Sequence, residues 1–150
     1  MRVVIQRVKS ATVTVEWKEV AAIGKGYLLL VGFSRVDNEI IAEKAAEKIS
    51  NLRIFNDAAG KMNLRITEVE GEILSVSQFT LYADLASGRR PSFINSAPAS
   101  QAEELYEVFN KSLRNLGLEV KTGIFQADML VTLENDGPVT VILDSGDFKW

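Results

Sequence analysis

The chain has 150 residues, of which 47% are hydrophobic and 25% charged, the balance expected of one compact domain spanning residues 1–150. It contains no cysteine and no histidine, which excludes disulfides, thiolate nucleophiles, zinc fingers and Ser-His-Asp triads, and we expect neither a metal ion nor another cofactor. The formal net charge of -3 disfavours broad electrostatic binding of nucleic acid, and no DNA partner is expected.

Residues 20–33 form the longest apolar stretch, but Lys25 interrupts it and it falls short of the ~20 residues that span a bilayer. The residues after Met1 show a strand-like pattern rather than the apolar core of a signal peptide. The sequence therefore predicts a soluble, cytoplasmic protein without a membrane partner.

The first elements along the chain are strands. Segments 2–8 and 11–15 are rich in β-branched residues, and the polar segment 16–19 predicts a turn after them. Segment 27–33 is continuously apolar, which is typical of a strand buried on both faces. We expect that strand to lie in the centre of a sheet.

An amphipathic helix follows, with Asp37 as its predicted N-cap. Its apolar and alanine positions recur at helical spacing and predict one face packed on the sheet: Ile41, Ala45, Ile49 and Leu52. Segment 53–55 predicts a short strand, and segment 56–60 predicts a turn.

Segment 72–81 predicts a second strongly β-forming strand, which contains polar residues. The loop at 87–97 is longer than most connections, and such loops are often functional. A second helix follows, for which Pro98 suits the first turn and Ser100 with Glu103 matches a capping box.

Gly117 is predicted to end the second helix, and segments 119–122, 129–133 and 139–143 are again strand-like. Segment 135–138 is predicted to connect the last two strands. Together the elements predict a single α/β domain, with two main helices on one side of a curved mixed β-sheet whose strand order stays open.

Hydrogen-bonding side chains at Ser77, Gln78 and Thr80 stand among plainly apolar neighbours. A buried amide or hydroxyl without a partner costs about 1 to 3 kcal/mol, so a strand end that opens onto a pocket explains them economically. The alternative is a strand with one solvated face, in which Ser77 and Phe79 point to one side of the strand and Gln78 and Thr80 to the other.

Residues 135–138, Asn-Asp-Gly-Pro, form the second candidate motif. Gly137 allows a close backbone approach, and Pro138 fixes φ while it removes a hydrogen-bond donor. On the pattern alone a hairpin turn is the stronger interpretation, because such residues mark turns in many proteins.

Basic residues offer a third candidate despite the negative net charge. Arg89 and Arg90 in the long loop, with Lys61 and Arg65, could form a local basic edge for nucleic acid. The alternative, which composition favours, is a solvated loop.

The two motifs also carry a resemblance to a known family. Val-Ser-Gln-Phe-Thr-Leu at 76–81 and Asn-Asp-Gly-Pro-Val-Thr at 135–140 resemble the signature motifs of the D-aminoacyl-tRNA deacylases, formerly called D-tyrosyl-tRNA deacylases. The resemblance spans the chain, with further segments in the family's order at 5–8, 53–55, 60–63, 90–93, 122–125 and 127–129.

The resemblance implies a carboxylic ester hydrolase, an enzyme that cleaves D-aminoacyl-tRNA at its 3′ end, accepts glycyl-tRNA to some degree and spares L-aminoacyl-tRNA. Such an activity serves chiral proofreading in translation. The resemblance also implies a homodimer, in which the sheet is barrel-like and Gly137 and Pro138, joined by a cis peptide bond, enter the partner's pocket. Their carbonyls would exclude a side chain on one side of the α-carbon.

The resemblance also assigns the site residues. Arg7 supports the Gly137-Pro138 segment, and the remaining substrate-binding residues are Asn135, Phe125 and Met129. The catalytic motif consists of Ser77, Gln78, Phe79 and Thr80.

Chemistry limits what Thr80 can do, because a threonine hydroxyl is a weak nucleophile without a base and the chain has no histidine. We expect Thr80 to position the substrate, backbone N–H groups of Phe79 and Thr80 to stabilise the oxyanion, and the vicinal ribose hydroxyl of tRNA to assist. Ser77 and Gln78 are expected to shape the site, and Phe79 and Met129 to form its wall. A binding module without catalysis and a structural dimerisation domain are the rival hypotheses.

Overall fold

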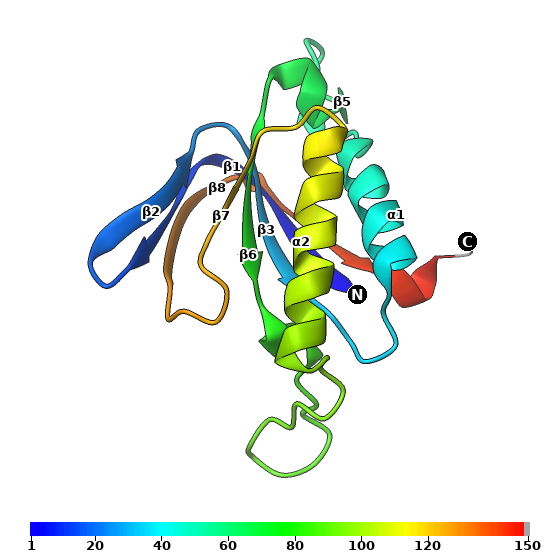
Figure 1. The fold of residues 1–150 in the computed structure, drawn as a ribbon. Coiled ribbons are helices and arrows are strands. Elements are labelled where there is room, and N and C mark those ends of the chain that lie inside the picture. The colour runs from blue at the N-terminus through cyan, green and yellow to red at the C-terminus, as the bar shows by residue number, and fades with distance from the viewer. Residues whose placement is uncertain (149–150) are drawn as a thin grey trace.

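The computed structural model describes residues 1–148 and contains a mixed six-stranded sheet, a small two-stranded sheet and two long helices (Figure 1). In the main sheet β2 and β3 share one edge of β1, and β8 runs along the other edge. The pairs β3–β6 and β6–β7 are parallel, and the others are antiparallel. The elements are β1 (Arg2–Val15), β2 (Lys18–Ile23), β3 (Gly26–Gly32), α1 (Glu39–Ser50), β4 (Phe55–Asn56), β5 (Met62–Leu64), η1 (Ile66–Val69), β6 (Glu72–Ser77), η2 (Phe79–Tyr82), α2 (Ala99–Asn115), β7 (Val120–Thr122), β8 (Leu130–Asp144) and η3 (Ser145–Asp147).

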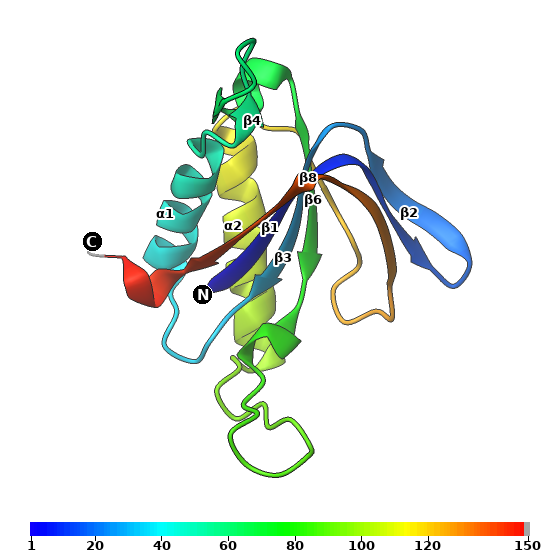
Figure 2. The same cartoon turned by 180° about the vertical axis from the view of Figure 1, so that it is seen from behind.

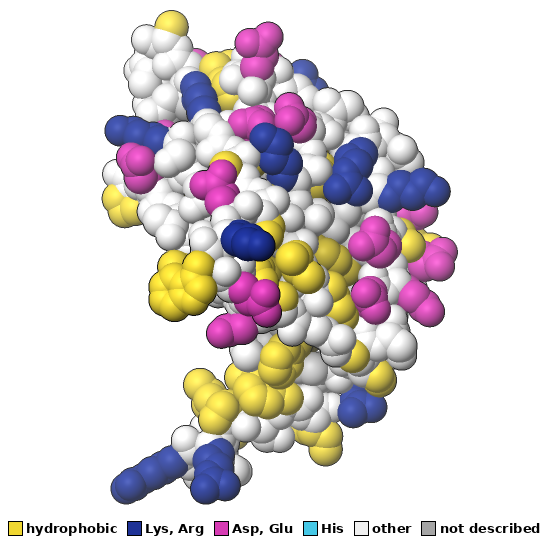
Figure 3. Space-filling model, turned by 60° about the vertical axis from the view of Figure 1, so that its left-hand side comes forward, with side chains coloured by type: hydrophobic (Ala, Val, Ile, Leu, Met, Phe, Trp, Pro, Cys, Tyr) yellow, Lys and Arg dark blue, Asp and Glu magenta, His cyan; other side chains and the backbone are white. Residues whose placement is uncertain are grey.

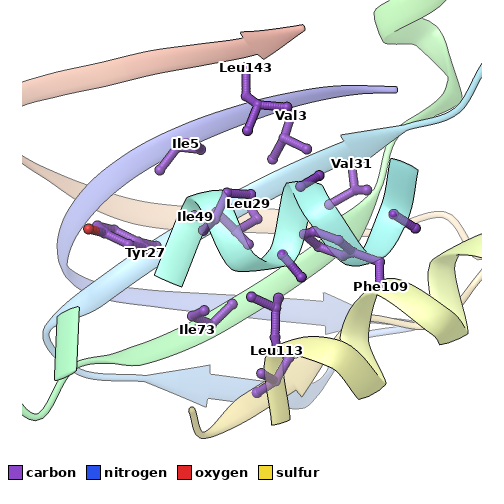
Figure 4. Close-up of a cluster of buried hydrophobic side chains, with 14 of the residues drawn as sticks. Val3, Ile5, Tyr27, Leu29, Val31, Ile49, Ile73, Phe109, Leu113 and Leu143 are labelled. Atoms are coloured by element: carbon purple, nitrogen blue, oxygen red, sulfur yellow. The ribbon is translucent and has the colours of Figure 1, made fainter. Parts of the chain in front are cut away.

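The helices α1 and α2 lie side by side on one face of the sheet, as the sequence predicts (Figures 1 and 2). Ile49 of α1 and Phe109 and Leu113 of α2 are fully buried against the strands. Figure 4 shows how the strand side chains Val3 and Leu29 point toward these helices. No helix within residues 1–148 is both long and apolar enough to cross a membrane.

The strand β3 is central, because its side chains are buried on both faces of the sheet. Tyr27, Leu29 and Val31 belong to the core under the helices. Leu28 belongs to a second apolar cluster on the opposite face, where Val13 and other side chains of β1 and β2 cover it. The continuous apolar run in the sequence therefore corresponds to a two-sided core strand, which confirms the prediction.

The sheet is strongly curved, so that β2 approaches β6 and β7 across the second apolar cluster. Lys121 of β7 donates a hydrogen bond from Nζ to the carbonyl oxygen of Ala22 at 2.9 Å and pairs with Glu72 Oε1 at 3.1 Å. At the start of β3, Gly26 permits the close approach of β6, because a Cβ there would lie 1.8 Å from the carbonyl oxygen of Glu72. The curved mixed sheet of the predicted α/β domain is thereby confirmed.

One connection differs from the prediction, because residues 135–138 are not a hairpin turn. Residues 130–133 and 139–143 of the two predicted strands belong to one strand, β8, which stays antiparallel to β1 with irregular register between Gln6 and Ser10. Extra residues loop out between the pairs Gln6–Thr140 and Val8–Asn135. Asn135 holds this bulge, since its Nδ2 donates to the carbonyl oxygens of Arg7 and Val139 at 2.9 and 3.0 Å.

Two predicted helix caps are also wrong. The N-cap of α1 is Asn38, whose Oδ1 accepts from the N–H of Ile41 at 3.1 Å, while Asp37 is buried and accepts from Ser34. The N-cap of α2 is Pro98, and no side chain caps that helix. Ser100 therefore lies inside the helix, because α2 begins two residues earlier than the capping-box pattern indicates.

The predicted strand at 72–81 ends at Ser77, and the 3₁₀-helix η2 occupies 79–82. Gln78 joins the two elements with φ -144 and ψ 80. The alternative in which Ser77 and Phe79 alternate with Gln78 and Thr80 along a solvated strand is therefore wrong. The strand end instead opens onto a pocket.

Candidate active site

A pocket of about 590 Å³ lies at the carboxyl ends of the parallel strands β3 and β6. Neighbouring strands that run in the same direction deliver their following loops to one edge, where ligands bind in many α/β sheets. Beyond the strand ends, the N-terminal turn of α2 and the segment before β8 complete the wall. The lining residues are Val31, Gly32, Phe33, Val76, Ser77, Gln78, Phe79, Ala97, Ala99, Ala102, Phe125, Gln126, Ala127, Asp128, Met129 and Val131.

The floor of the pocket is a close contact between β3 and the turn that follows β6. The N–H of Gln78 donates to the carbonyl oxygen of Val31 at 2.7 Å. A Cβ on Gly32 would lie 2.8 Å from the carbonyl oxygen of Gln78, so only glycine fits without a backbone shift. The glycine at the end of β3 thus fixes where the Gln78 turn lies.

The first amide groups of η2 are the hydrogen-bond donors of the site. In a 3₁₀-helix the first N–H groups have no acceptor within the helix. Within residues 1–148 the N–H groups of Phe79 and Thr80 have no hydrogen-bond acceptor. Thr80 itself is exposed and does not line the pocket, but its hydroxyl accepts a hydrogen bond from Gln78 Nε2.

Two residues of the segment that precedes α2 contact Phe79 and fix its position. The hydroxyl of Ser96 donates to the carbonyl oxygen of Phe79 at 3.2 Å. The rings of Phe79 and Phe93 meet edge to face, with their centroids 4.9 Å apart. Phe125 and Met129 also line the pocket.

The pocket lining offers one side chain that could act as a general base, the carboxylate of Asp128. Within residues 1–148 no other charged side chain lines the pocket. Tyr82 in the adjoining η2 stays protonated, because burial raises the pKa of its phenol to about 12. Within residues 1–148 no group of three or more acidic, histidine or cysteine side chains is placed to hold a metal ion. The arrangement can therefore bind and polarise a carbonyl group through backbone N–H groups.

The second predicted motif lies elsewhere in the chain. Gly137 and Pro138 are joined by a cis peptide bond, are exposed and do not line the pocket. Arg7 is buried beneath them and donates from Nε to the carbonyl oxygen of Asp136 at 3.1 Å and from Nη1 to that of Ile54 at 2.7 Å. These bonds confirm that Arg7 supports the bulge that carries Gly137.

The register of β1 fixes how far apart the two motifs lie. Arg7, beside the bulge, pairs with Tyr27 at the start of β3, whereas the pocket begins at the end of that strand. Tyr27 and Gly32 lie roughly 17 Å apart at the usual rise of a β-strand. Arg7, Asn135, Gly137 and Pro138 therefore do not reach the pocket of their own chain.

The basic edge suggested by the sequence is divided in the structure. Lys61 and Arg65 lie by β4 and β5, at the opposite end of the molecule from the loop with Arg89 and Arg90 (Figure 1). Arg65 is also paired with Glu68 at 3.3 Å. The expectation of one edge made from all four residues is wrong.

Several pocket residues could not be singled out from the sequence. Gly32 and Ser96 act through contacts with residues 78–79 that only the fold creates. Ala99 and Ala102 line the pocket because small side chains at the start of α2 leave space. Their spacing of three along a helix is the one available signal, and it is common in helices that pack closely.

Comparisons with known proteins agree with the geometry. A model of the family described as D-Tyr-tRNA(Tyr) deacylase matches residues 4–144. A "D-aminoacyl-tRNA deacylase" of Lactobacillus acidophilus is 55% identical over 144 residues, covering 96% of this chain and 99% of that protein. Another, of Thermomicrobium roseum, is 53% identical over 149 residues and covers 99% of this chain and 97% of that protein.

Two solved structures are similar in fold. One, described as "c-Myc DNA Unwinding Element Binding Protein", is 41% identical with a TM-score of 0.90 and covers 96% of this chain and 98% of its own. The other, described as a probable eukaryotic D-amino acid tRNA deacylase, is 20% identical with a TM-score of 0.82, covers 95% and 97%, and supports the fold. Since the family model and the curated relatives span nearly the whole sequence, this chain belongs to the D-Tyr-tRNA(Tyr) deacylase family.

Proposed function

We propose that the pocket at the ends of β3 and β6 binds the aminoacyl end of tRNA and that the ester bond to a D-amino acid is hydrolysed there. By family the chain is a D-aminoacyl-tRNA deacylase, an enzyme that releases free amino acid and tRNA. The observation that carries the placement is the pocket wall, where Ser77, Gln78 and Phe79 meet beside two backbone N–H groups that have no acceptor within residues 1–148. Because charged tRNA is used in the cytoplasm, we place the activity there, in translational proofreading.

The proposed reaction uses few protein groups. The N–H groups of Phe79 and Thr80 donate to the ester carbonyl oxygen and stabilise the negative charge that forms on it when water attacks. The vicinal ribose hydroxyl assists proton transfer, and collapse of the tetrahedral intermediate breaks the bond to the ribose oxygen. The absence of histidine and the protonated state of Tyr82 support a mechanism in which the substrate supplies part of the chemistry.

We assign the chiral filter to Gly137 and Pro138 of a second copy of the chain. Main-chain carbonyls of this segment would face the α-carbon of the amino acid and leave space for a hydrogen but not for a side chain. An L-aminoacyl ester would clash, while a D-aminoacyl ester would fit. Glycyl-tRNA, which has no side chain, would also be accepted to some degree.

The separation within one chain supports a homodimer as the active form. The bulge and the pocket lie near opposite ends of β3, so one chain cannot close both around a substrate. The edge strand β8, which carries the bulge, also presents large apolar side chains, with Leu130 66% and Ile142 70% exposed. A second subunit would cover this surface and bring Gly137 to the pocket.

The test is release of labelled amino acid from D-Tyr-tRNA, L-Tyr-tRNA and Gly-tRNA. We expect fast release from the D-ester, slower release from the glycyl ester and none above background from the L-ester. If the protein retains tRNA but releases no amino acid, it is a binding module. If it neither binds tRNA nor releases amino acid, it is a structural domain. Either result contradicts the proposal.

A second candidate function comes from the similarity to the structure described as a DNA unwinding element binding protein. The net charge of -3 argues against broad DNA binding by this chain. Gel-shift titration with duplex DNA at 150 mM salt would decide, and tight binding there would favour this alternative.

A further inference from the structure

The loop between η2 and α2, residues 83–98, protrudes from the body beside the pocket (Figure 1). Its only basic residues are Arg89 and Arg90, which follow Gly88 at an exposed tip. In Figure 3 this loop lies at the lower left, with dark blue side chains at its end and hydrophobic ones toward the body. Neither arginine has an ion pair or hydrogen bond within residues 1–148.

The base of this loop is fixed to the pocket wall. Asp84 and Ser92 exchange backbone hydrogen bonds of 2.7 and 3.0 Å, which close the loop into a narrow arm. The segment that returns from the tip to α2, residues 92–97, is held by the contact of Phe93 with Phe79. The base of the arm therefore has a defined position relative to the residues that line the pocket, and it holds the tip on this side of the molecule.

A further arginine strengthens the positive charge near this arm. Arg35 donates from Nε to the carbonyl oxygen of Ile94 at 2.7 Å and so lies against residues 92–97 of the arm. The first turn of α2 contains no acidic residue, and no side chain caps its N–H groups. Although the whole chain carries a net charge of -3, three arginines, Arg35, Arg89 and Arg90, lie on the arm or against it, and residues 83–102 contain one acidic residue, Asp84.

We propose that residues 84–92 bind the phosphate backbone of the substrate RNA next to its 3′-terminal nucleotide, with Arg89 and Arg90 contacting two phosphates. This inference rests on the proposed function. A pocket of about 590 Å³ has space for an amino acid and its terminal nucleoside, so the preceding nucleotides lie outside it. Each of them carries a phosphate.

The residue type fits this role. A guanidinium group presents a planar set of donors that matches two phosphate oxygens and loses less hydration than an ammonium group. An arm that served only solubility would gain nothing from a defined position beside the pocket. The arm instead places its two cations where a strand leaving the pocket passes.

The test measures binding apart from hydrolysis. A fluorescently labelled, uncharged hairpin with the tRNA acceptor stem and its single-stranded 3′ end is titrated at several salt concentrations. We expect Arg89→Ala with Arg90→Ala to weaken binding at least tenfold and to reduce the slope of log K against log salt by about 1.4, or ~0.7 for each phosphate of a single strand. Arg89→Lys with Arg90→Lys should keep the salt slope, because the charge stays, and should lose part of the affinity, because an ammonium group cannot match two phosphate oxygens with a planar set of donors.

The matched control is Lys48→Ala with Lys111→Ala, which removes the same charge from the outer sides of α1 and α2. Lys111 lies about 18 Å along α2 from Ala99, so this pair should bind within twofold of the wild type. The proposal would be overturned if both double variants lost equal RNA affinity, or if the alanine variant of Arg89 and Arg90 kept the wild-type salt slope.

Hydrolysis adds a second measurement on the same variants. The alanine pair should raise KM for D-Tyr-tRNA at least tenfold and leave kcat within twofold, while cleavage of D-tyrosyl-adenosine stays unchanged. Loss of cleavage of D-tyrosyl-adenosine would contradict a role restricted to phosphates. If the wild type cleaves no D-ester but the binding results hold, the proposed function fails and the RNA contact stands.

Discussion

Gly32→Ala should damage the pocket from a position outside both sequence motifs. The added Cβ would lie 2.8 Å from the carbonyl oxygen of Gln78 and 3.2 Å from Leu81 Cβ. A methyl group does not approach a backbone oxygen that closely, so the Gln78 turn must move by a few tenths of an ångström. That turn leads directly into the N–H groups of Phe79 and Thr80.

The size of the effect follows from the geometry. Inserting a methyl group into a well-packed site typically costs about 1 to 3 kcal/mol of the free energy of unfolding. For a domain of this size that corresponds to a decrease in Tm of about 2 to 12 °C. Because a displacement of ~1 Å can cost about 100-fold in rate, a shift of a few tenths should lower kcat roughly tenfold.

The assay combines thermal unfolding with release of D-tyrosine from D-Tyr-tRNA, and Gly24→Ala is the matched control. A Cβ on Gly24 would lie 3.7 Å from Glu72 Oε2, an ordinary contact, so its free energy of unfolding should change by less than about 1 kcal/mol. If the two variants are equally stable and equally active, the contact between Gly32 and Gln78 does not shape the site.

Further results are expected from three substitutions, one modified substrate and sedimentation. Thr80→Ala should keep at least a tenth of the wild-type kcat, whereas a 3′-esterified substrate that ends in 2′-deoxyadenosine should react at least 100-fold more slowly. Complete loss of activity in Thr80→Ala, or normal turnover of the deoxy substrate, would refute substrate assistance. Gly137→Ala should lower kcat/KM for D-Tyr-tRNA and Gly-tRNA together, because φ is +125° there and the added Cβ would lie 2.7 Å from Val139 Cγ2, and undiminished D-selective turnover would place the chiral filter elsewhere. Glu72→Gln should lower Tm more at pH 7 than under acid conditions, because the N–H of Gly24, and then Lys121, hold the pKa of Glu72 below its ordinary value. The stabilisation is present above the unfolded pKa of about 4.3 and is lost as pH falls through the folded pKa, so a Tm difference independent of pH would contradict this. Sedimentation should give a dimer at micromolar concentration, and a fully active monomer would exclude a pocket shared between subunits.

The architecture was predictable where hydrophobic patterns are long. The apolar segment 27–33 and the two amphipathic helices supplied β3, α1 and α2 with nearly correct bounds. Their patterns are strong because one stripe of each helix, or both faces of the strand, must be buried. The order of strands depends on pairing between distant segments, and no local pattern specifies it.

Prediction failed where a long-range contact overrides local preference. The β-forming residues 78–81 leave the strand after the N–H of Gln78 has made the last bond of the β6–β3 pairing to Val31, and they continue as η2 beside Gly32 of β3. Likewise, Asn135 bonds to Arg7 of β1 and to Val139 further along β8, and the chain stays in one strand where the sequence indicates a hairpin. In both cases a contact with another strand is involved.

The candidate site was predictable in its residues more than in its geometry. Ser77, Gln78, Phe79, Phe125 and Met129 do line one pocket, yet the motifs that suggest them say nothing of the distance to Gly137. That distance follows from the register of β1 against β3. The role of Gly32 depends on a single backbone contact that only coordinates reveal.

The pairing of the first strand with the last also bears on how the chain is made. Within the described residues β8 pairs only with β1, in a ladder that runs from Arg2 opposite Asp144 to Thr14 opposite Leu130. During synthesis β1 emerges before β8, so one edge of β1 stays unpaired until β8 has been made. Exchange of β8 between two nascent chains is therefore the misassembly that this topology most readily permits.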